Sequence, residues 1–276
     1  MLRRIVILAV VSGLVAASAF AQGTRSRRVE QQPAAAVSAP HAAATDPALD
    51  PLALPALPFA PGETLTYDVE WNNNTRAATL TLAVGDKGTY FGQQGLQLTA
   101  NVQTVGMVRL FATVEGAFKS FSNPRTMLPF RAENRSSVNG KVESQTIVFD
   151  RDKGVAVVGQ RSTPIAADTG DPLSLFYRLR ALPLKIGDTY TLDGFVERRE
   201  QWKAVVEARE SIPTDRGSSN AFRIAFMPVK GGQPDDANKI RIWFTDTAAR
   251  VPVLITAEPT FGPIRMTLTS SRGAKA

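Results

Sequence analysis

The side chains that carry out most acid–base and nucleophilic chemistry are almost absent from this chain. It contains no cysteine, and its only histidine is His41. Catalytic triads, cysteine nucleophiles, histidine general bases and the usual zinc sites each require one of these two residue types. His41 lies in a segment that we expect to be disordered, so the folded part has neither an imidazole nor a thiol. We therefore expect a protein that is not an enzyme and has no catalytic residues, no metal site and no cofactor.

Carboxylates are the remaining groups with the potential for acid–base or metal chemistry. Glu63, Asp68 and Glu70 form the densest group. Asp68 and Glu70 lie on one face of a predicted strand, about 7 Å apart, because a strand rises ~3.4 Å per residue. Alternating acids are also ordinary on the solvent-exposed face of a strand, and we favour this interpretation. The loop with Asp235 and Asp236 offers too few regularly spaced oxygen ligands for Ca²⁺.

A short helix predicted over residues 172–181 carries the first candidate binding residues. Asp171 supplies an N-cap and a proline follows it at the first helical position. Phe176 and Tyr177 belong to the apolar side of this helix, and Arg180 lies in its last turn. Two roles are open for Arg180, namely a bond to a neighbouring acid or carbonyl, and a polar contact in a ligand pocket. We take Phe176, Tyr177 and Arg180 as candidate ligand-binding residues.

Two more candidates lie on a predicted strand near the C-terminus. Ile240, Ile242 and Phe244 share one face of this strand, which leaves Arg241 and Trp243 on the other face. Three uses of Trp243 are open, because an indole can stack on a guanidinium, cover a second apolar layer, or contact a ligand. We include Trp243 and Arg241 among the candidate ligand-binding residues.

Most of the chain after Pro58 alternates between apolar and polar residues, which is the pattern of half-buried strands. Leu65, Tyr67 and Val69 share one face, and a turn at 72–74 leads to a second alternating run. Asn139-Gly140 is a strong signal for a two-residue hairpin. We count about twelve strands on this basis.

Several of these strands, over residues 155–158, 221–227 and 251–255, are apolar on both faces. A sheet of a simple two-layer sandwich buries one face only, so a second cover is needed. We therefore predict a mainly β fold, in which a large, strongly curved antiparallel sheet or half-open barrel wraps the helix at residues 172–181 on its concave side.

The ends of the chain differ from this β-rich part. Arg3 and Arg4 precede an apolar run of 13 residues, and Ala19 and Ala21 have the spacing of a cleavage site, which predicts a signal peptide over residues 1–21. The run is shorter than the ~20 residues of a spanning helix, so an uncleaved anchor is the weaker alternative. Residues 22–57 contain ten Ala and five Pro and are predicted to be a disordered linker. Residues 58–272 are predicted to form one domain.

Three segments of this domain carry motifs of a known family. They are F-x-x-G-E-x-L-x-Y at 59–67, D-x-x-S-x-x-Y-x-x-R at 171–180 with P-L-x-x-G at 183–187, and W-x-x-D with R-x-P-V at 243–253. In this order they resemble the DUF3108 family, an uncharacterised group of exported bacterial β-rich domains. The resemblance implies a β-rich fold and a place in the cell envelope, and it supplies no catalytic residues.

The charge balance limits the partners. The net charge of +7 falls to +5 without the signal peptide, and the bases are scattered among acids, so we expect no nucleic-acid partner. We expect a soluble periplasmic protein with no stable membrane anchor after cleavage. Two functions remain open: binding of a lipid or another apolar or amphipathic envelope ligand in the concave face, and envelope assembly or maintenance through contact with an envelope protein.

Overall fold

The computed structural model describes residue 50 and residues 52–72, 75–214, 217–260 and 262–274. The predicted signal peptide, His41 and most of the predicted linker lie outside the described residues. The domain boundaries that we predict from the sequence therefore stay predictions.

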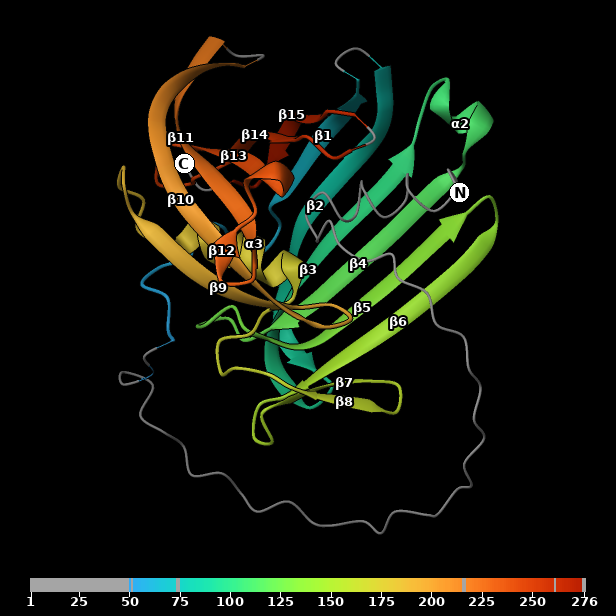
Figure 1. Ribbon diagram of the computed structural model, residues 1–276, viewed down its shortest axis with the longest axis vertical. Coiled ribbons are helices and arrows are strands. Elements are labelled where there is room, and N and C mark those ends of the chain that lie inside the picture. Colours follow the sequence, from blue (N-terminus) through green and yellow to red (C-terminus); the bar gives the residue numbers. More distant parts are fainter. Residues whose placement is uncertain (1–49, 51, 73–74, 215–216, 261, 275–276) are drawn as a thin grey trace.

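Strands make up most of the described chain (Figure 1). The first half contains β1 (Thr64–Trp71), β2 (Thr75–Tyr90), β3 (Gln93–Thr104), β4 (Val114–Ser122), β5 (Pro129–Val138), β6 (Lys141–Asp150), β7 (Val155–Val158) and β8 (Arg161–Pro164). The second half contains β9 (Thr189–Phe195), β10 (Arg199–Thr214), β11 (Gly217–Lys230), β12 (Gln233–Pro234), β13 (Ile240–Thr245), β14 (Pro252–Ala257) and β15 (Ile264–Arg272). The helical segments are α2 (Val108–Phe111), α3 (Pro172–Ala181) and the 3₁₀ turn η2 (Asp236–Asn238).

All these strands belong to one antiparallel sheet whose middle is formed by the two ends of the domain. The order is β8-β7-β6-β5-β4-β3-β2-β1-β15-β14-β13-β11-β10-β9, with β12 paired to β11. The chain therefore runs as a meander from β1 out to one edge at β8, crosses to the opposite edge at β9, and returns to β15 beside β1. The expected strongly curved, half-open antiparallel sheet is confirmed, with 15 strands where the sequence indicated about twelve.

The register keeps the alternating apolar residues on one face. Leu65 lies opposite Leu82 and Tyr67 opposite Leu80 across β1 and β2, and Leu80 in turn lies opposite Val102 of β3. These side chains are buried in the main core together with residues from both halves of the sheet. The predicted hairpin at Asn139-Gly140 is also confirmed, and both residues have positive φ angles of 48° and 81°.

Helix α3 fills the concavity between the two halves of the sheet (Figure 1). Eight of its ten residues are buried, and it contacts β3, β4 and β9. Asp171 caps its N-terminus by accepting a hydrogen bond from Ser174 N, as the sequence predicts. The helix lies inside because the chain must cross from edge β8 to edge β9, and this crossing carries an apolar stripe that needs burial.

The segment that enters α3 is fastened to the edge strand β9. Gly170 N donates to Asp193 O at 2.8 Å, and Phe195 N donates to Gly170 O at 2.9 Å. A Cβ atom at Gly170 would lie 2.6 Å from Leu175 Cδ2 of the helix, so any larger residue would force the buried Leu175 side chain to shift. Backbone pairing and close packing together fix the start of the helix against the edge strand β9.

A smaller apolar layer on the convex face accounts for two of the three strands that are apolar on both sides, namely those at 221–227 and 251–255. It consists of Ile212, Ala221, Trp243, Val253 and Leu254. They come from β10, β11, β13 and β14, and next to Ala221, Trp243 and Leu254 lie Phe222, Phe244 and Ile255, which belong to the main core or pack against it. Apolar side chains on the concave face of the sheet are buried against α3, and those on the convex face pack together in this layer.

Candidate functional site

A fully buried ion pair lies between β1 and the last turn of α3. Arg180 Nη1 donates to Glu63 Oε1 at 2.7 Å and Nη2 donates to Oε2 at 3.1 Å, so the pair is bidentate. Both side chains have a relative exposure of 0%. Arg180 also donates to the carbonyls of Ala249 at 3.0 Å and Arg250 at 3.1 Å. Of the two roles that the sequence leaves open for Arg180, the structure shows the bond to an acid and to carbonyls.

The three segments that resemble the family motifs meet around this ion pair. Glu63 comes from the first segment, Arg180 from the second and Arg250 from the third. Tyr67 of the first segment donates from its hydroxyl to Pro252 O of the third at 2.7 Å. Phe59 packs edge-on against Tyr177 at 4.8 Å between ring centroids, which joins the first segment to the second. Segments far apart in the sequence thus form one interlocked centre.

Burial changes the titration of the two tyrosines in this centre. Desolvation raises the pKa of Tyr67 well above its usual value, with the nearby Arg180 acting in the opposite direction. The pKa of Tyr177 is also raised by burial, again opposed by Arg180. Both phenols are therefore neutral at physiological pH, and neither is activated as a base or nucleophile.

The hydroxyl of Tyr177 is buried and has no hydrogen-bond partner among the described residues. We predict that Tyr177→Phe stabilises the protein by about 1 kcal/mol, because it removes an unsatisfied buried polar group. Tyr67→Phe is the matched control, since it removes a satisfied hydroxyl and is expected to destabilise by about 1 kcal/mol. Urea unfolding of both variants measures the difference. Equal destabilisation by the two changes would contradict the prediction.

A second buried polar centre lies at the N-terminus of α3. Asp171 Oδ2 accepts from Ser120 Oγ at 2.5 Å, and its Oδ1 accepts from Ser174 N at 2.9 Å. Burial raises the pKa of Asp171 to about 6, while the hydrogen bonds from Ser120 and the helix backbone lower it in part. This carboxyl group caps the helix in the interior of the protein.

The five candidate binding residues from the sequence lie on two faces of the sheet. Phe176, Tyr177 and Arg180 are buried together inside the concavity. Trp243 is buried in the convex layer, where its Nε1 donates to Glu210 Oε1 at 2.5 Å, and Arg241 lies nearby. The structure therefore brings three candidates together and separates them from the other two.

The carboxylates that the sequence singled out do not form a cluster. Glu63 is buried against Arg180, whereas Asp68 pairs with Arg76 at 2.7 Å on the partly exposed face. Asp235 and Asp236 pair with Lys230 and Lys239. In the described part of the chain, no group of three or more His, Asp or Glu side chains is placed to hold a metal ion.

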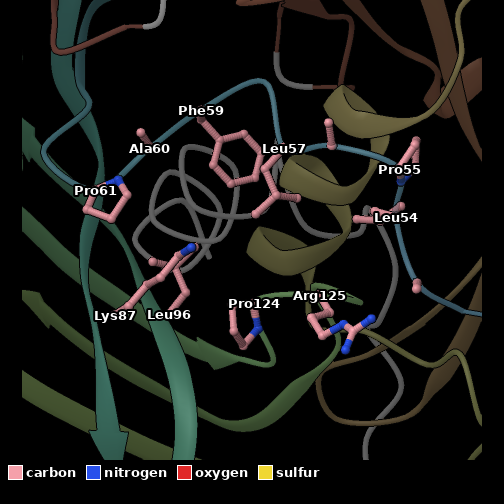
Figure 2. A pocket seen from close by; sticks show the side chains of 12 residues that line it. Leu54, Pro55, Leu57, Phe59, Ala60, Pro61, Lys87, Leu96, Pro124 and Arg125 are labelled. Carbon is pink, nitrogen blue, oxygen red and sulfur yellow. The ribbon is translucent and has the colours of Figure 1, made fainter. Parts of the chain in front are cut away.

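A cavity of about 380 Å³ lies outside α3, under the segment of residues 53–61 (Figure 2). This segment is fastened at both ends, since Leu54 N donates to Arg125 O at 2.9 Å and Gly62 N donates to Val84 O at 2.8 Å. Between these points it arches past β2, β3 and the β4–β5 turn. The volume of the cavity is at the lower end of the roughly 300–1,000 Å³ that small-molecule sites occupy.

The floor of this cavity is apolar and its rim is cationic. Phe59 and Leu96 are almost fully buried, and Leu57 lies beside Phe59 (Figure 2). Lys87 and Arg125 line the rim and are exposed. The twelve lining residues include no acid; they are Ala53, Leu54, Pro55, Ala56, Leu57, Phe59, Ala60, Pro61, Lys87, Leu96, Pro124 and Arg125.

A bulge in β2 brings the rim and the floor together. The pairing of β2 with β3 shifts its register between Val84 and Lys87, and Lys87 then lies directly opposite Leu96. Bulges of this kind re-aim side chains next to binding sites. These residues could not be predicted from the sequence, because one wall of the cavity is the end of the predicted linker. The Leu residues at 54 and 57 were the available signal, since they pack against the main core.

Comparisons with known proteins place the chain among uncharacterised families. A family model described as "Protein of unknown function (DUF3108)" matches residues 66–269. No curated protein gives a significant match. In the described residues no helix is long and apolar enough to cross a membrane.

Among solved structures, a β-barrel-like protein of the DUF1849 family from Brucella abortus has a TM-score of 0.54 at 12% identity, and the match covers 80% of this chain and 100% of that chain. A DUF1089 family protein from Pseudomonas aeruginosa has a TM-score of 0.33 at 10% identity, over 73% of this chain and 92% of that chain. A protein from Bacteroides fragilis, described as exported and YmcC-like in fold, has a TM-score of 0.32 at 12% identity, over 80% and 99%. The first similarity shows a shared fold alone, and the other two carry no argument.

Proposed function

The chain belongs to the DUF3108 family, and we propose that it is a non-catalytic exported protein that binds an amphipathic, anionic ligand of the cell envelope. The observation that carries this proposal is the cavity under residues 53–61, with its apolar floor and cationic rim. The family name assigns no activity, so the proposal rests on the residues of this chain.

The buried polar groups support a role without catalysis. Arg180 donates hydrogen bonds to Glu63 and to two backbone carbonyls, and Asp171 caps a helix. A catalytic group must be able to reach a substrate, and these three are fully buried among structural partners. Their arrangement stabilises the fold around α3.

The chemistry of the cavity favours an acyl chain that ends in an acid. Phe59 and Leu96 lie at the base of the cavity and are themselves almost fully buried, so the gain comes from the acyl chain, which leaves water when it enters. Lys87 and Arg125 at the rim attract a carboxylate or phosphate that remains partly in water. The side chains of α3 occupy the concave face, where the sequence led us to expect a ligand, and this cavity is the binding site that we propose instead.

The place of action follows from the N-terminal pattern. Basic residues, a short apolar run and small residues at 1–21 are typical of a signal for export. An exported bacterial protein is exposed to lipids and other acyl-bearing molecules of the envelope. We infer that the periplasm is where the cavity meets its ligand.

Dodecanoate is a suitable probe, with dodecanol as its uncharged counterpart. We predict that the full chain binds dodecanoate with one-to-one stoichiometry and at least about tenfold more tightly than dodecanol, in isothermal titration calorimetry below the micelle concentration. Lys87→Glu is expected to weaken dodecanoate binding about tenfold, since it replaces an attraction by a repulsion at the rim.

Lys119→Glu is the matched control, because it makes the same charge change at an exposed position of β4 that does not line the cavity. Dodecanoate binding by this variant should equal that of the wild type. The proposal fails if the wild type binds no dodecanoate, or if the two variants bind it equally well.

A further inference from the structure

The loop that joins β3 to β4 holds three large apolar side chains in solvent. This β3–β4 loop comprises residues 105–113 and contains α2 (Figure 1). The relative exposure is 68% for Met107, 78% for Leu110 and 82% for Phe111. Single exposed apolar residues are ordinary, but three within five positions form a patch, and such patches mark interaction surfaces.

The exposure of these side chains belongs to a well-anchored conformation. Thr104 Oγ1 accepts a hydrogen bond from Val114 N at 3.0 Å and donates to Ala112 O at 3.0 Å, which closes the base of the loop. Thr113 N donates to Asn139 Oδ1 at 2.8 Å, and Asn139 N donates back to Thr113 O at 2.8 Å. The loop is thereby fastened to the β5–β6 hairpin, and its apolar side chains are held outward without a partner in the described chain.

One positive charge lies within this patch. Arg109 is exposed, and it is the only charged residue among positions 105–113. Lys141 begins β6, two residues after the anchoring Asn139, and it is exposed although it pairs with Glu143.

We propose that the β3–β4 loop docks the protein on an anionic phospholipid bilayer. Met107, Leu110 and Phe111 enter the interface between head groups and acyl chains, where such side chains bind favourably. Arg109 contacts lipid phosphates, because a long basic side chain can reach the head-group layer while its neighbours are inserted.

The shape and position of the loop support this choice of partner. The apolar side chains project from one short helical turn at the end of a hairpin, which suits insertion into a soft interface. The cavity of the proposed function lies toward the other end of β3, near Leu96, whereas the loop follows Thr104. Membrane docking therefore goes beyond ligand binding and can be tested without any ligand.

Vesicle partition tests the proposal directly. We expect the full chain to bind vesicles of phosphatidylethanolamine and phosphatidylglycerol more tightly than vesicles of phosphatidylcholine alone. The double variant Leu110→Ser/Phe111→Ser should partition at least about tenfold more weakly, because it removes two inserting side chains. Ile186→Ser is the matched control, since Ile186 is 57% exposed and lies in the loop before β9, and its partition should equal that of the wild type.

A site-specific probe locates the contact. The chain has no cysteine, so Leu110→Cys and Ile186→Cys each provide one position for an environment-sensitive fluorophore. Vesicles should shift the emission of the probe at position 110 to the blue and leave the probe at position 186 unchanged. Any vesicle binding contributed by residues 1–49 is common to all these proteins and does not alter this comparison.

Four results would overturn the proposal. The first is partition of Leu110→Ser/Phe111→Ser that equals the wild type, and the second is an equal response of the two probes. The third is self-association of the wild type without vesicles that the double variant abolishes, because the loop would then bind a second copy of the chain. The fourth is equal binding to anionic and neutral vesicles, because Arg109 would then not select an anionic surface.

Discussion

Arg180→Met is expected to lower the free energy of unfolding by about 3–5 kcal/mol, the typical cost of breaking a buried ion pair. The change leaves the Glu63 carboxylate without its bidentate partner at a position of 0% exposure. The carbonyls of Ala249 and Arg250 lose their donor at the same time. Guanidinium unfolding followed by tryptophan fluorescence measures the loss.

Arg209→Met is the matched control for this variant. Arg209 pairs with Asp246 at 2.6 Å, but the two side chains are 48% and 32% exposed. Its loss is expected to cost about 0–1 kcal/mol, since solvent screens an exposed pair. If the two arginine variants unfold at the same denaturant concentration, the Glu63–Arg180 pair does not have the role that its burial implies.

The double variant Glu63→Leu/Arg180→Met separates the cost of an unpaired charge from the loss of packing. It removes both charges together and is expected to recover a large part of the stability lost in Arg180→Met. This variant also keeps the prediction testable if the single change prevents folding. Failure of the double variant to recover any stability would show that the two carbonyl contacts, and not the ion pair, dominate.

The features of this fold that the sequence predicts correctly are those determined by short local patterns. The helix begins at Asp171 because a capping acid and a proline stand in adjacent positions, and its bounds match the prediction of 172–181. Asn139-Gly140 predicts its hairpin because both positions tolerate positive φ. Alternation alone places Leu65, Tyr67 and Val69 on the buried face. Each of these features is decided by residues within a few positions of one another.

The partner of Arg180 could not be predicted in the same way. Glu63 lies 117 positions earlier, and the two meet because β1 pairs with β15 while α3 crosses the concavity. The sequence left open whether Arg180 binds an acid or carbonyl or contacts a ligand, and the first of these is confirmed, whereas Glu63 was expected among solvent-exposed acids. Long-range topology, which no local pattern contains, decides between these alternatives.

The cavity and the exposure of the β3–β4 loop could not be predicted from the sequence, for different reasons. The composition of residues 22–57 predicts a linker, yet Leu54 and Leu57 at its end pack on the core. A proline-rich wall of this kind is ordered by its hydrogen bonds to Arg125 and Val84, and these contacts are tertiary. An apolar run such as Met107 to Phe111 is usually buried, so its exposure becomes visible only in the folded structure.

Asp171 is expected to make the stability of the protein depend on pH in an unusual direction. Burial raises its pKa to about 6 in the folded state, against 3.8 for the ordinary carboxyl. Between these two pH values the folded state binds a proton that the unfolded state has lost, so stability falls as pH rises. The shift of about two units corresponds to roughly 3 kcal/mol, fully present below about pH 4 and lost above about pH 6.

Asp171→Asn isolates this effect, because asparagine caps a helix about as well as aspartate and does not titrate. The free energy of unfolding of the wild type minus that of Asp171→Asn should fall by roughly 3 kcal/mol from pH 4 to pH 7, while contributions of other carboxyl groups cancel in the difference. Asp150→Asn is the control of opposite sign, since a hydrogen bond from Lys153 lowers the pKa of Asp150 below its ordinary value of 3.8. Its difference should stay flat from pH 4 to pH 7 and fall only when the pH drops below about 4. A flat difference for Asp171 would mean that this carboxyl ionises in the folded protein as readily as in the unfolded chain. Water would then reach the N-terminus of α3, and the interior around Asp171 would not be dry.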